Sequence, residues 1–126
     1  MTACEFVANE IESEGIKAYI GLLYSDEGMV EDENSVVVFD GTHTTVPSVG
    51  SRTDYSVNEL NLLVHGSKSL QESLTLAMRV GEAVREVKNE EFIVFDCNEA
   101  RLKGRDEYGI WESEIELKVL RKEVFV

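Results

Sequence analysis

The chain has 126 residues, of which 43% are hydrophobic and 29% are charged. These ordinary globular values argue against wholesale disorder and predict one domain over residues 1–126 with a real hydrophobic core. The formal net charge of −13 argues against ordinary nucleic-acid binding, because phosphate contacts require Lys and Arg. The acidic residues are scattered along the chain, so they do not form an acidic tail. Four explanations of the negative charge stay open: a solvated surface, a tube lining that repels DNA, adaptation to high salt, and DNA mimicry.

Nothing in the sequence indicates export or membrane insertion. No apolar run is long enough to span a bilayer, and the N-terminal residues lack the pattern of a signal peptide. We therefore expect a cytosol-like compartment, or a particle that is assembled there. Cys4 and Cys97 form no CxxC motif and no Cys/His cluster, so free buried thiols are expected, with a disulfide left open.

The first predicted element is a helix over residues 3–14. Thr2 and Glu5 have the spacing of a capping box, and Gly15 can adopt the left-handed conformation that ends a helix. Phe6 is expected on the opposite side from the buried stripe, either as a lone exposed aromatic residue or as a docking residue for a neighbour. The stripe that should pack on the domain contains Cys4, Val7, Ala8 and Ile11.

Three strands are predicted next, over residues 16–24, 35–40 and 57–65. The acidic segment 25–34 lies between the first two and lacks the residue order of an EF-hand, so a solvated loop is expected. The segment 41–55 is rich in Gly, Thr and Ser, and we expect a long loop there. Loops of that length tend to bind partners or to be mobile.

A long helix is predicted over residues 67–87, with Ser67 or Ser69 as its N-terminal cap. Its polar residues occupy well under half of the circumference, whereas a helix lying on one sheet needs only a narrow apolar stripe. The surplus apolar surface must be covered by the first helix or by another subunit.

The last two predicted strands cover residues 92–97 and 110–121, with a hairpin turn over 104–109. The final strand alternates regularly between apolar and charged residues. Its charged side is expected to be solvated, because like-charged neighbours along one strand are tolerable only in water or opposite cations. The apolar side contains Trp111, Ile115, Leu117 and Val119, and the charged side contains Glu112, Glu114, Glu116 and Lys118.

The predicted element order is therefore α-β-β-β-α-β-β. Short connections and alternating patterns favour an α+β fold, with a mainly antiparallel β-sheet of about five strands and both helices on one side.

No motif for catalysis or cofactor binding is present: the sequence lacks a phosphate loop, HExxH, GxSxG and a Rossmann fingerprint. His43 and His65 have no partner at metal-ligand spacing, so each is expected to be a plain surface or edge histidine. The hydroxyls around His43 and the Asp96–Cys97 pair could serve nucleophilic chemistry, but no spacing rule singles them out. We predict no enzyme, no metal and no cofactor.

Two stretches carry a resemblance to a known family. Ile16-Lys-Ala-Tyr-Ile-Gly-Leu-Leu-Tyr24 follows a short N-terminal helix, and Leu102-Lys-Gly-Arg-Asp-Glu-Tyr-Gly109 precedes an alternating strand. In both respects the chain resembles the minor capsid and tail-terminator proteins of tailed phages, which act in tail completion and head–tail joining. The third strand, Gly66 and the long helix fall in matching order.

The resemblance implies a tail-terminator-like fold and a structural virion protein at the head–tail interface, assembled in the host cytoplasm. It implies a self-associated ring, commonly a homohexamer, that caps the tail tube protein and receives the head-connector or adaptor proteins. DNA would pass through without specific binding, and no membrane would be involved. The alternative function is an acidic cytosolic binding module, such as an inhibitor or DNA mimic, which should be a monomer with a basic partner.

The sequence pattern and the resemblance together give the candidate site residues. Residues expected at protein interfaces are Phe6, Thr42, His43, Thr44, Thr45, Val46, Pro47, Arg85 and Phe125. Residues expected to line a channel are Glu112, Glu114 and Glu116.

Overall fold

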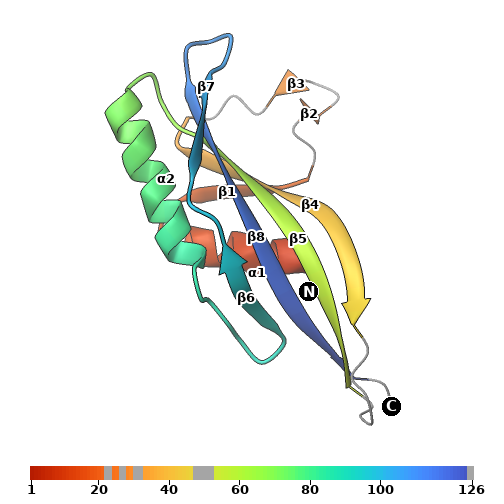
Figure 1. The fold of residues 1–126 in the computed structure, drawn as a ribbon. Helices are drawn as coiled ribbons and strands as arrows, with labels where there is room; N and C mark the ends of the chain where they lie inside the picture. The colour runs from red at the N-terminus through yellow and green to blue at the C-terminus, as the bar shows by residue number, and fades with distance from the viewer. Residues whose placement is uncertain (22–23, 26–27, 30–32, 47–52, 125–126) are drawn as a thin grey trace.

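The computed structural model describes residues 1–21, 24–25, 28–29, 33–46 and 53–124, and for 24–25, 28–29, 42–46, 53–55 and 123–124 it describes the backbone alone. This part of the chain forms helices and strands in the order drawn in Figure 1. The elements are α1 (Ala3–Ser13), β1 (Lys17–Ile20), β2 (Tyr24–Ser25), β3 (Gly28–Met29), β4 (Ser35–Val46), β5 (Thr53–His65), α2 (Leu70–Val84), β6 (Phe92–Cys97), β7 (Arg101–Arg105) and β8 (Trp111–Val124).

The main sheet has the strand order β1-β4-β5-β8-β6, and β7 pairs with β8 beyond the end of β6. All of these pairs are antiparallel except β1 with β4, which is parallel. The predicted α+β class and the largely antiparallel sheet are confirmed. The sheet is mixed, however, and β7 is a strand that the sequence analysis did not predict.

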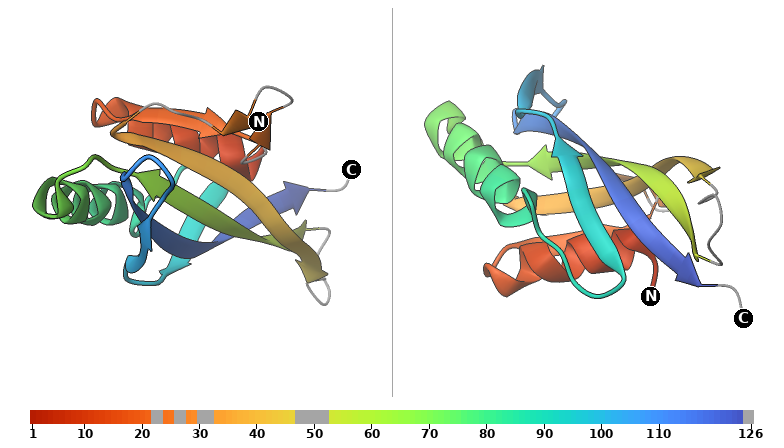
Figure 2. Two further views of the ribbon diagram at one scale, coloured as in Figure 1. Left: turned by 90° about the horizontal axis from the view of Figure 1, so that it is seen from above. Right: turned by 60° about the horizontal axis from the view of Figure 1, so that its bottom comes forward.

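One face of the sheet carries the hydrophobic core, and both helices contribute to it. Figure 2 shows α1 running crosswise to α2, with the sheet beside them. The ladder pairs Leu62 with Ile115 and Leu60 with Leu117, so these four side chains lie on the same face. Ile115, Leu117 and Val119 are all buried, which confirms the predicted register of the last strand.

Both helices begin where the sequence predicts. The Thr2 hydroxyl accepts a hydrogen bond of 3.1 Å from the Glu5 amide, and Ser69 caps α2 by accepting one of 3.3 Å from the Glu72 amide. Gly15 follows α1 with a φ of +79°, as expected for a helix stop. Helix α2 is shorter than predicted, because it ends at Val84.

The predicted loop over 41–55 is wrong for most of its length. Residues 41–46 continue β4 and residues 53–55 begin β5. Residues 43–46 pair with 55–58 of β5, and residues 53–55 pair with 122–124 of β8. A register shift between Asp40 and His43 accommodates Gly41, where an added Cβ would lie 2.6 Å from the carbonyl oxygen of Glu59. The far ends of β4, β5 and β8 extend past the helices as an arm (Figure 1). The remainder, 47–52, lies outside the described residues.

The predicted strand 16–24 is also shorter in the structure. It ends at Ile20, and Gly21 has a φ of +128°, which an L side chain rarely adopts. Within the acidic segment that follows, the solvated-loop prediction misses a short antiparallel pairing of β2 with β3.

Candidate interface surfaces and a buried polar cluster

Phe6 is not on the surface, and the prediction that it is exposed is wrong. Its side chain is only 2% exposed, and its ring stacks on that of Phe92 with 5.2 Å between the centroids. The predicted stripe of Cys4, Val7, Ala8 and Ile11 is buried as well. Helix α1 therefore buries a wider arc than its stripe suggested, because β6 reaches it from the far edge of the sheet.

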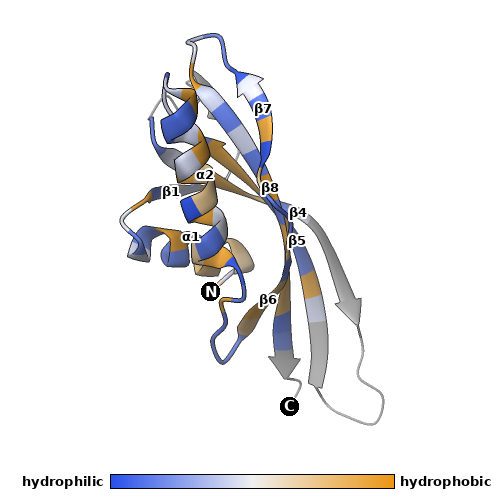
Figure 3. Cartoon of the chain, turned by 60° about the vertical axis from the view of Figure 1, so that its left-hand side comes forward, coloured by the Kyte–Doolittle hydropathy of each residue, from blue (hydrophilic) through white to orange (hydrophobic). Residues whose placement is uncertain are grey.

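Helix α2 leaves an apolar stripe in solvent. Leu70, Leu74 and Met78 are 39%, 41% and 66% exposed, and their spacing of four residues places them along one side of the helix. The adjoining side of α2 is buried through Leu76, Ala77, Val80 and Val84, so the three exposed residues run along the margin of the buried side. In Figure 3 hydrophobic and hydrophilic residues alternate along α2. The first helix does not cover this stripe, which we call the α2 stripe (Leu70, Leu74 and Met78).

A second apolar surface lies on the opposite face of the sheet, which no helix covers. Ile93 in β6 is 41% exposed, and the ladder pairs it with Leu120, which in turn pairs with Val57. Leu120 and Val57 are half-buried. Phe95, beside the β6 register shift, is 52% exposed. We call Ile93, Phe95, Leu120 and Val57 the open-face patch.

The three glutamates predicted to line a channel do not share one environment. Arg101 in β7 bridges two of them, with its Nη2 atom 3.1 Å from Glu116 Oε1 and 3.7 Å from Glu114 Oε2. The Glu116 side chain is 48% exposed, whereas that of Glu114 is 28% exposed. Glu112 differs from both, because its Oε2 atom is buried. The predicted solvated row therefore holds for Glu116 and fails for Glu112.

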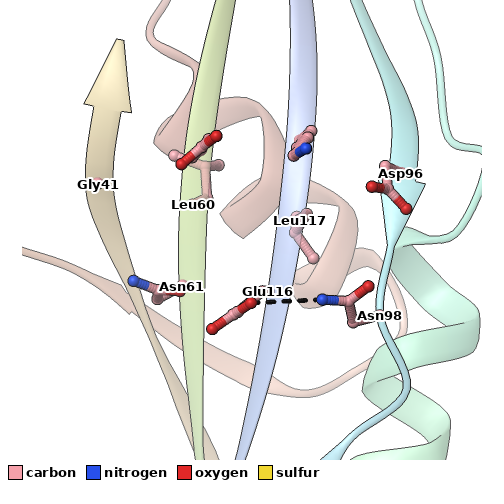
Figure 4. Close-up of a pocket in the computed structure, with 9 residues that line it drawn as sticks. Gly41, Leu60, Asn61, Asp96, Asn98, Glu116 and Leu117 are labelled. Carbon is pink, nitrogen blue, oxygen red and sulfur yellow. Dashed lines mark hydrogen bonds between the residues drawn. The ribbon is translucent and has the colours of Figure 1, made fainter.

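The open face also has a polar hollow with a volume of about 620 Å³, lined by residues of β4, β5, β6 and β8 and by Asn98. Figure 4 shows Glu116 and Asn98 joined by a hydrogen bond, for which the Nδ2–Oε2 distance is 3.3 Å. The charged residues that line the hollow are Glu59, Asp96, Glu116 and Lys118. Among the described lining residues there is no histidine, serine or cysteine, so the hollow offers no pairing of a nucleophile with a base.

His65, at the end of β5, has a partner that the sequence analysis missed. Its Nε2 atom lies 3.0 Å from Oδ2 of Asp106, and the two side chains are 4% and 6% exposed. Asp106 is held by a turn, in which its Oδ1 atom accepts hydrogen bonds of 2.9 Å from the amides of Tyr108 and Ile110. The prediction that His65 is a plain edge histidine is wrong. Because the partners are 41 residues apart, no sequence spacing could reveal them.

Glu112 completes this polar cluster. The β5–β8 ladder places it directly opposite His65, and one ligand atom from each of His65, Asp106 and Glu112 lies within 4.8 Å of the others. Burial raises the pKa of the Glu112 carboxyl, against the lowering effect of the nearby His65. The pKa of Asp106 is lowered, because the hydrogen bonds from His65 and from two backbone amides outweigh the raising effect of burial.

Arg85 caps the C-terminal end of α2 and is exposed. Its guanidinium interacts with the thiol of Cys97, which is free and half-buried, whereas Cys4 is free and buried. Thr42, His43, Thr44, Thr45 and Val46 lie in the arm strand β4, where only the backbone is described. Pro47 and Phe125 lie outside the described residues.

In the part of the chain that the structure describes, neither helix is long and apolar enough to cross a membrane. No family model matches the sequence, and no curated protein matches it.

Proposed function

We propose that the chain is a structural subunit of a tailed virus particle that forms an oligomeric ring at the head–tail junction, as tail-terminator and tail-completion proteins do. The observation that carries the proposal is the α2 stripe, in which Leu70, Leu74 and Met78 are exposed along the margin of the side by which the helix packs on the domain. Exposed apolar surface of this kind on a small chain marks an interaction site.

The position of the open-face patch supports a ring over a two-fold dimer. The α2 stripe lies in the helix layer, beside the buried side of α2, and Ile93 and Phe95 lie on the face of the sheet that no helix covers. Two different apolar surfaces on one subunit suit head-to-tail contacts, whereas a two-fold dimer uses one self-complementary surface. Head-to-tail contacts close into a ring when the rotation per subunit allows it.

The charge supports a role around DNA without binding to it. A net charge of −13, and a hollow on the open face that holds the carboxylates of Glu59, Asp96 and Glu116 against the single lysine Lys118, would keep a passing duplex from binding to the channel wall. The partners in this proposal are further copies of the chain, the tail tube protein and the head-connector proteins. No catalytic step is part of the proposed function.

The test is the mass of the purified protein by light scattering across concentration and salt, followed by negative-stain imaging. We expect a discrete oligomer and closed rings. Replacing Leu74 and Met78 by Glu should release monomers, because it places charges in the buried centre of the interface. A matched control replaces Gln71 and Thr75, which are also exposed on α2, by Glu and should leave rings intact.

A wild-type protein that stays monomeric at every concentration and salt, and that captures a basic protein, would instead support the acidic binding module. If the stripe variant and its control have the same assembly state, the α2 stripe is not the contact that holds the ring together.

A further inference from the structure

We propose that His65, Asp106 and Glu112 form a binding site for a divalent transition-metal ion, and that zinc is the ion which suits their chemistry best. The site joins the end of β5, the turn before β8 and the beginning of β8. One imidazole nitrogen and two carboxylate oxygens are donors that zinc accepts, and a fourth position would remain for water.

The spacing of the donor atoms fits a single ion. Nitrogen and oxygen ligands bind zinc at about 2.0–2.2 Å, so two ligands of one tetrahedral ion lie about 3.3 Å apart. The Nε2 atom of His65 and the Oδ2 atom of Asp106 are already 3.0 Å apart. All three donor atoms lie within 4.8 Å of one another, so a side-chain rotation of Glu112 would complete the set.

The surroundings hold the donors in place. Two backbone amides bind Oδ1 of Asp106 and leave its Oδ2 atom directed at His65, which is how neighbouring groups orient the ligands of metal sites. The Gly66 amide donates to the Trp111 carbonyl at 2.9 Å, and the Trp111 amide donates to the Ser67 carbonyl at 3.0 Å. These bonds fix the two backbone segments that carry His65 and Glu112.

A buried atom without a partner is the independent sign of a ligand. The Oε2 atom of Glu112 is inaccessible to solvent and accepts no hydrogen bond, although a buried carboxylate oxygen without a partner is costly. Glu112 and Asp106 place two carboxylates around one imidazole in this buried space. A divalent cation would bind the unpartnered oxygen and neutralise both carboxylates.

The test measures zinc binding to untagged full-length protein after treatment with a chelator. We expect one zinc ion per chain by calorimetry and elemental analysis, a rise in Tm with zinc, and no comparable rise with magnesium, which prefers octahedral oxygen sites. Cobalt(II) should give the visible absorption of a four-coordinate site. A protein that binds no zinc, or binds it without a change in Tm or in the cobalt spectrum, would overturn the proposal.

Two variants locate the ion. Glu112→Gln should weaken zinc binding by roughly tenfold or more, since even groups that only orient a ligand are worth about 10–100-fold in affinity. The metal-free variant should fold, because a neutral amide replaces a partly buried carboxylate. The control Glu114→Gln lies two residues along the same strand and outside the cluster, and should bind zinc as the wild type does.

Asp106→Asn is the second variant, because its amide oxygen can keep the turn while the anionic ligand is lost. Equal zinc affinity in Glu112→Gln, Asp106→Asn and the control would show that zinc binds elsewhere on this acidic chain, and would overturn the site.

Discussion

The ring of Phe6 in α1 stacks on the ring of Phe92 in β6, with 5.2 Å between the centroids and 19° between the ring planes. The guanidinium of Arg121 also lies over the Phe92 ring, 5.6 Å from its centroid. This contact joins the first helix to the far edge strand of the sheet. It explains why a residue that the helical pattern placed in solvent is part of the core.

Phe6→Ala should therefore lower the free energy of unfolding by about 3–5 kcal/mol, as expected for the loss of a buried aromatic ring. Chemical denaturation followed by circular dichroism measures the change. The control is Asn9→Ala on the exposed side of α1, which should change stability by less than about 0.5 kcal/mol. If the Phe6 variant loses no more stability than the control, Phe6 does not belong to the core.

The sequence predicted the elements whose signals are local. The caps Thr2 and Ser69 give the beginnings of both helices, and the alternation of Ile115, Leu117 and Val119 gives the register of the last strand. These signals depend on hydrogen bonds within one turn or on a period of two, so they can be read without knowing the fold.

Features that depend on distant partners could not be predicted. The segment 41–55 has the composition of a loop, but its residues 43–46 pair with β5 and its residues 53–55 pair with β8. His65 is an isolated histidine in the sequence, and the fold brings Asp106 to it through a turn and Glu112 to it through the β5–β8 ladder. The α2 stripe was foreseen as surplus apolar surface, whereas its three residues were not identified.

Two glycines should respond in opposite directions to replacement by alanine. A Cβ on Gly66 would lie 2.6 Å from Cβ of Ser73, whose hydroxyl binds the backbone of Ser67 and Ser69. A Cβ on Gly81 would lie 4.0 Å from Cδ1 of Ile115, which is ordinary contact. Gly66→Ala should cost about 1–3 kcal/mol through overpacking.

Gly81→Ala should stabilise the protein by roughly 0.5–1 kcal/mol, because alanine is favoured over glycine inside a helix. Thermal unfolding of the two variants provides the comparison, and each is the control for the other. A stabilising Gly66→Ala would mean that the connection after β5 is not packed against Ser73.

The two cysteines should differ in their reactivity. Burial raises the pKa of the Cys4 thiol to about 11, with a smaller contribution from the carboxylates of Asp40 and Glu5. Burial also raises the pKa of Cys97, although Arg85 opposes the rise. At pH 8 we expect alkylation of Cys97 to be slow and alkylation of Cys4 to be slower still, as measured by mass spectrometry over time.

The raised pKa of Cys4 also predicts how the stability of the fold should change with pH. Because the folded state holds the thiol proton more tightly than the unfolded chain does, stability should fall as the pH rises from about 9 through about 11. In Cys4→Ala this part of the pH dependence should vanish, and an unchanged slope would show that other groups cause it. Rapid labelling of Cys4 in the native protein would contradict its burial.

The last prediction concerns the acidic part of the open face around Glu114 and Glu116, which lies nearer the beginning of β8 than the open-face patch does and would surround the DNA path in the proposed ring. Glu114 and Glu116 lie on the open face beside Arg101. Glu82 in α2 and Glu86 just after it are exposed and belong to the helix layer on the other side of the sheet. If the open face lines the channel, Glu114→Lys with Glu116→Lys should make assembled rings retain duplex DNA. Retention should weaken steeply with salt, because each lysine adds a phosphate contact that displaces counterions.

The control carries the same change of charge on the outside, as Glu82→Lys with Glu86→Lys. Its rings should retain less DNA at equal salt, since a duplex inside a channel meets every subunit at once and a duplex outside meets few. Filter binding of labelled DNA to rings isolated by sedimentation provides the measurement. If the outer variant retains DNA as well as the inner one, the open face does not surround the DNA, and the net charge of −13 serves solubility alone.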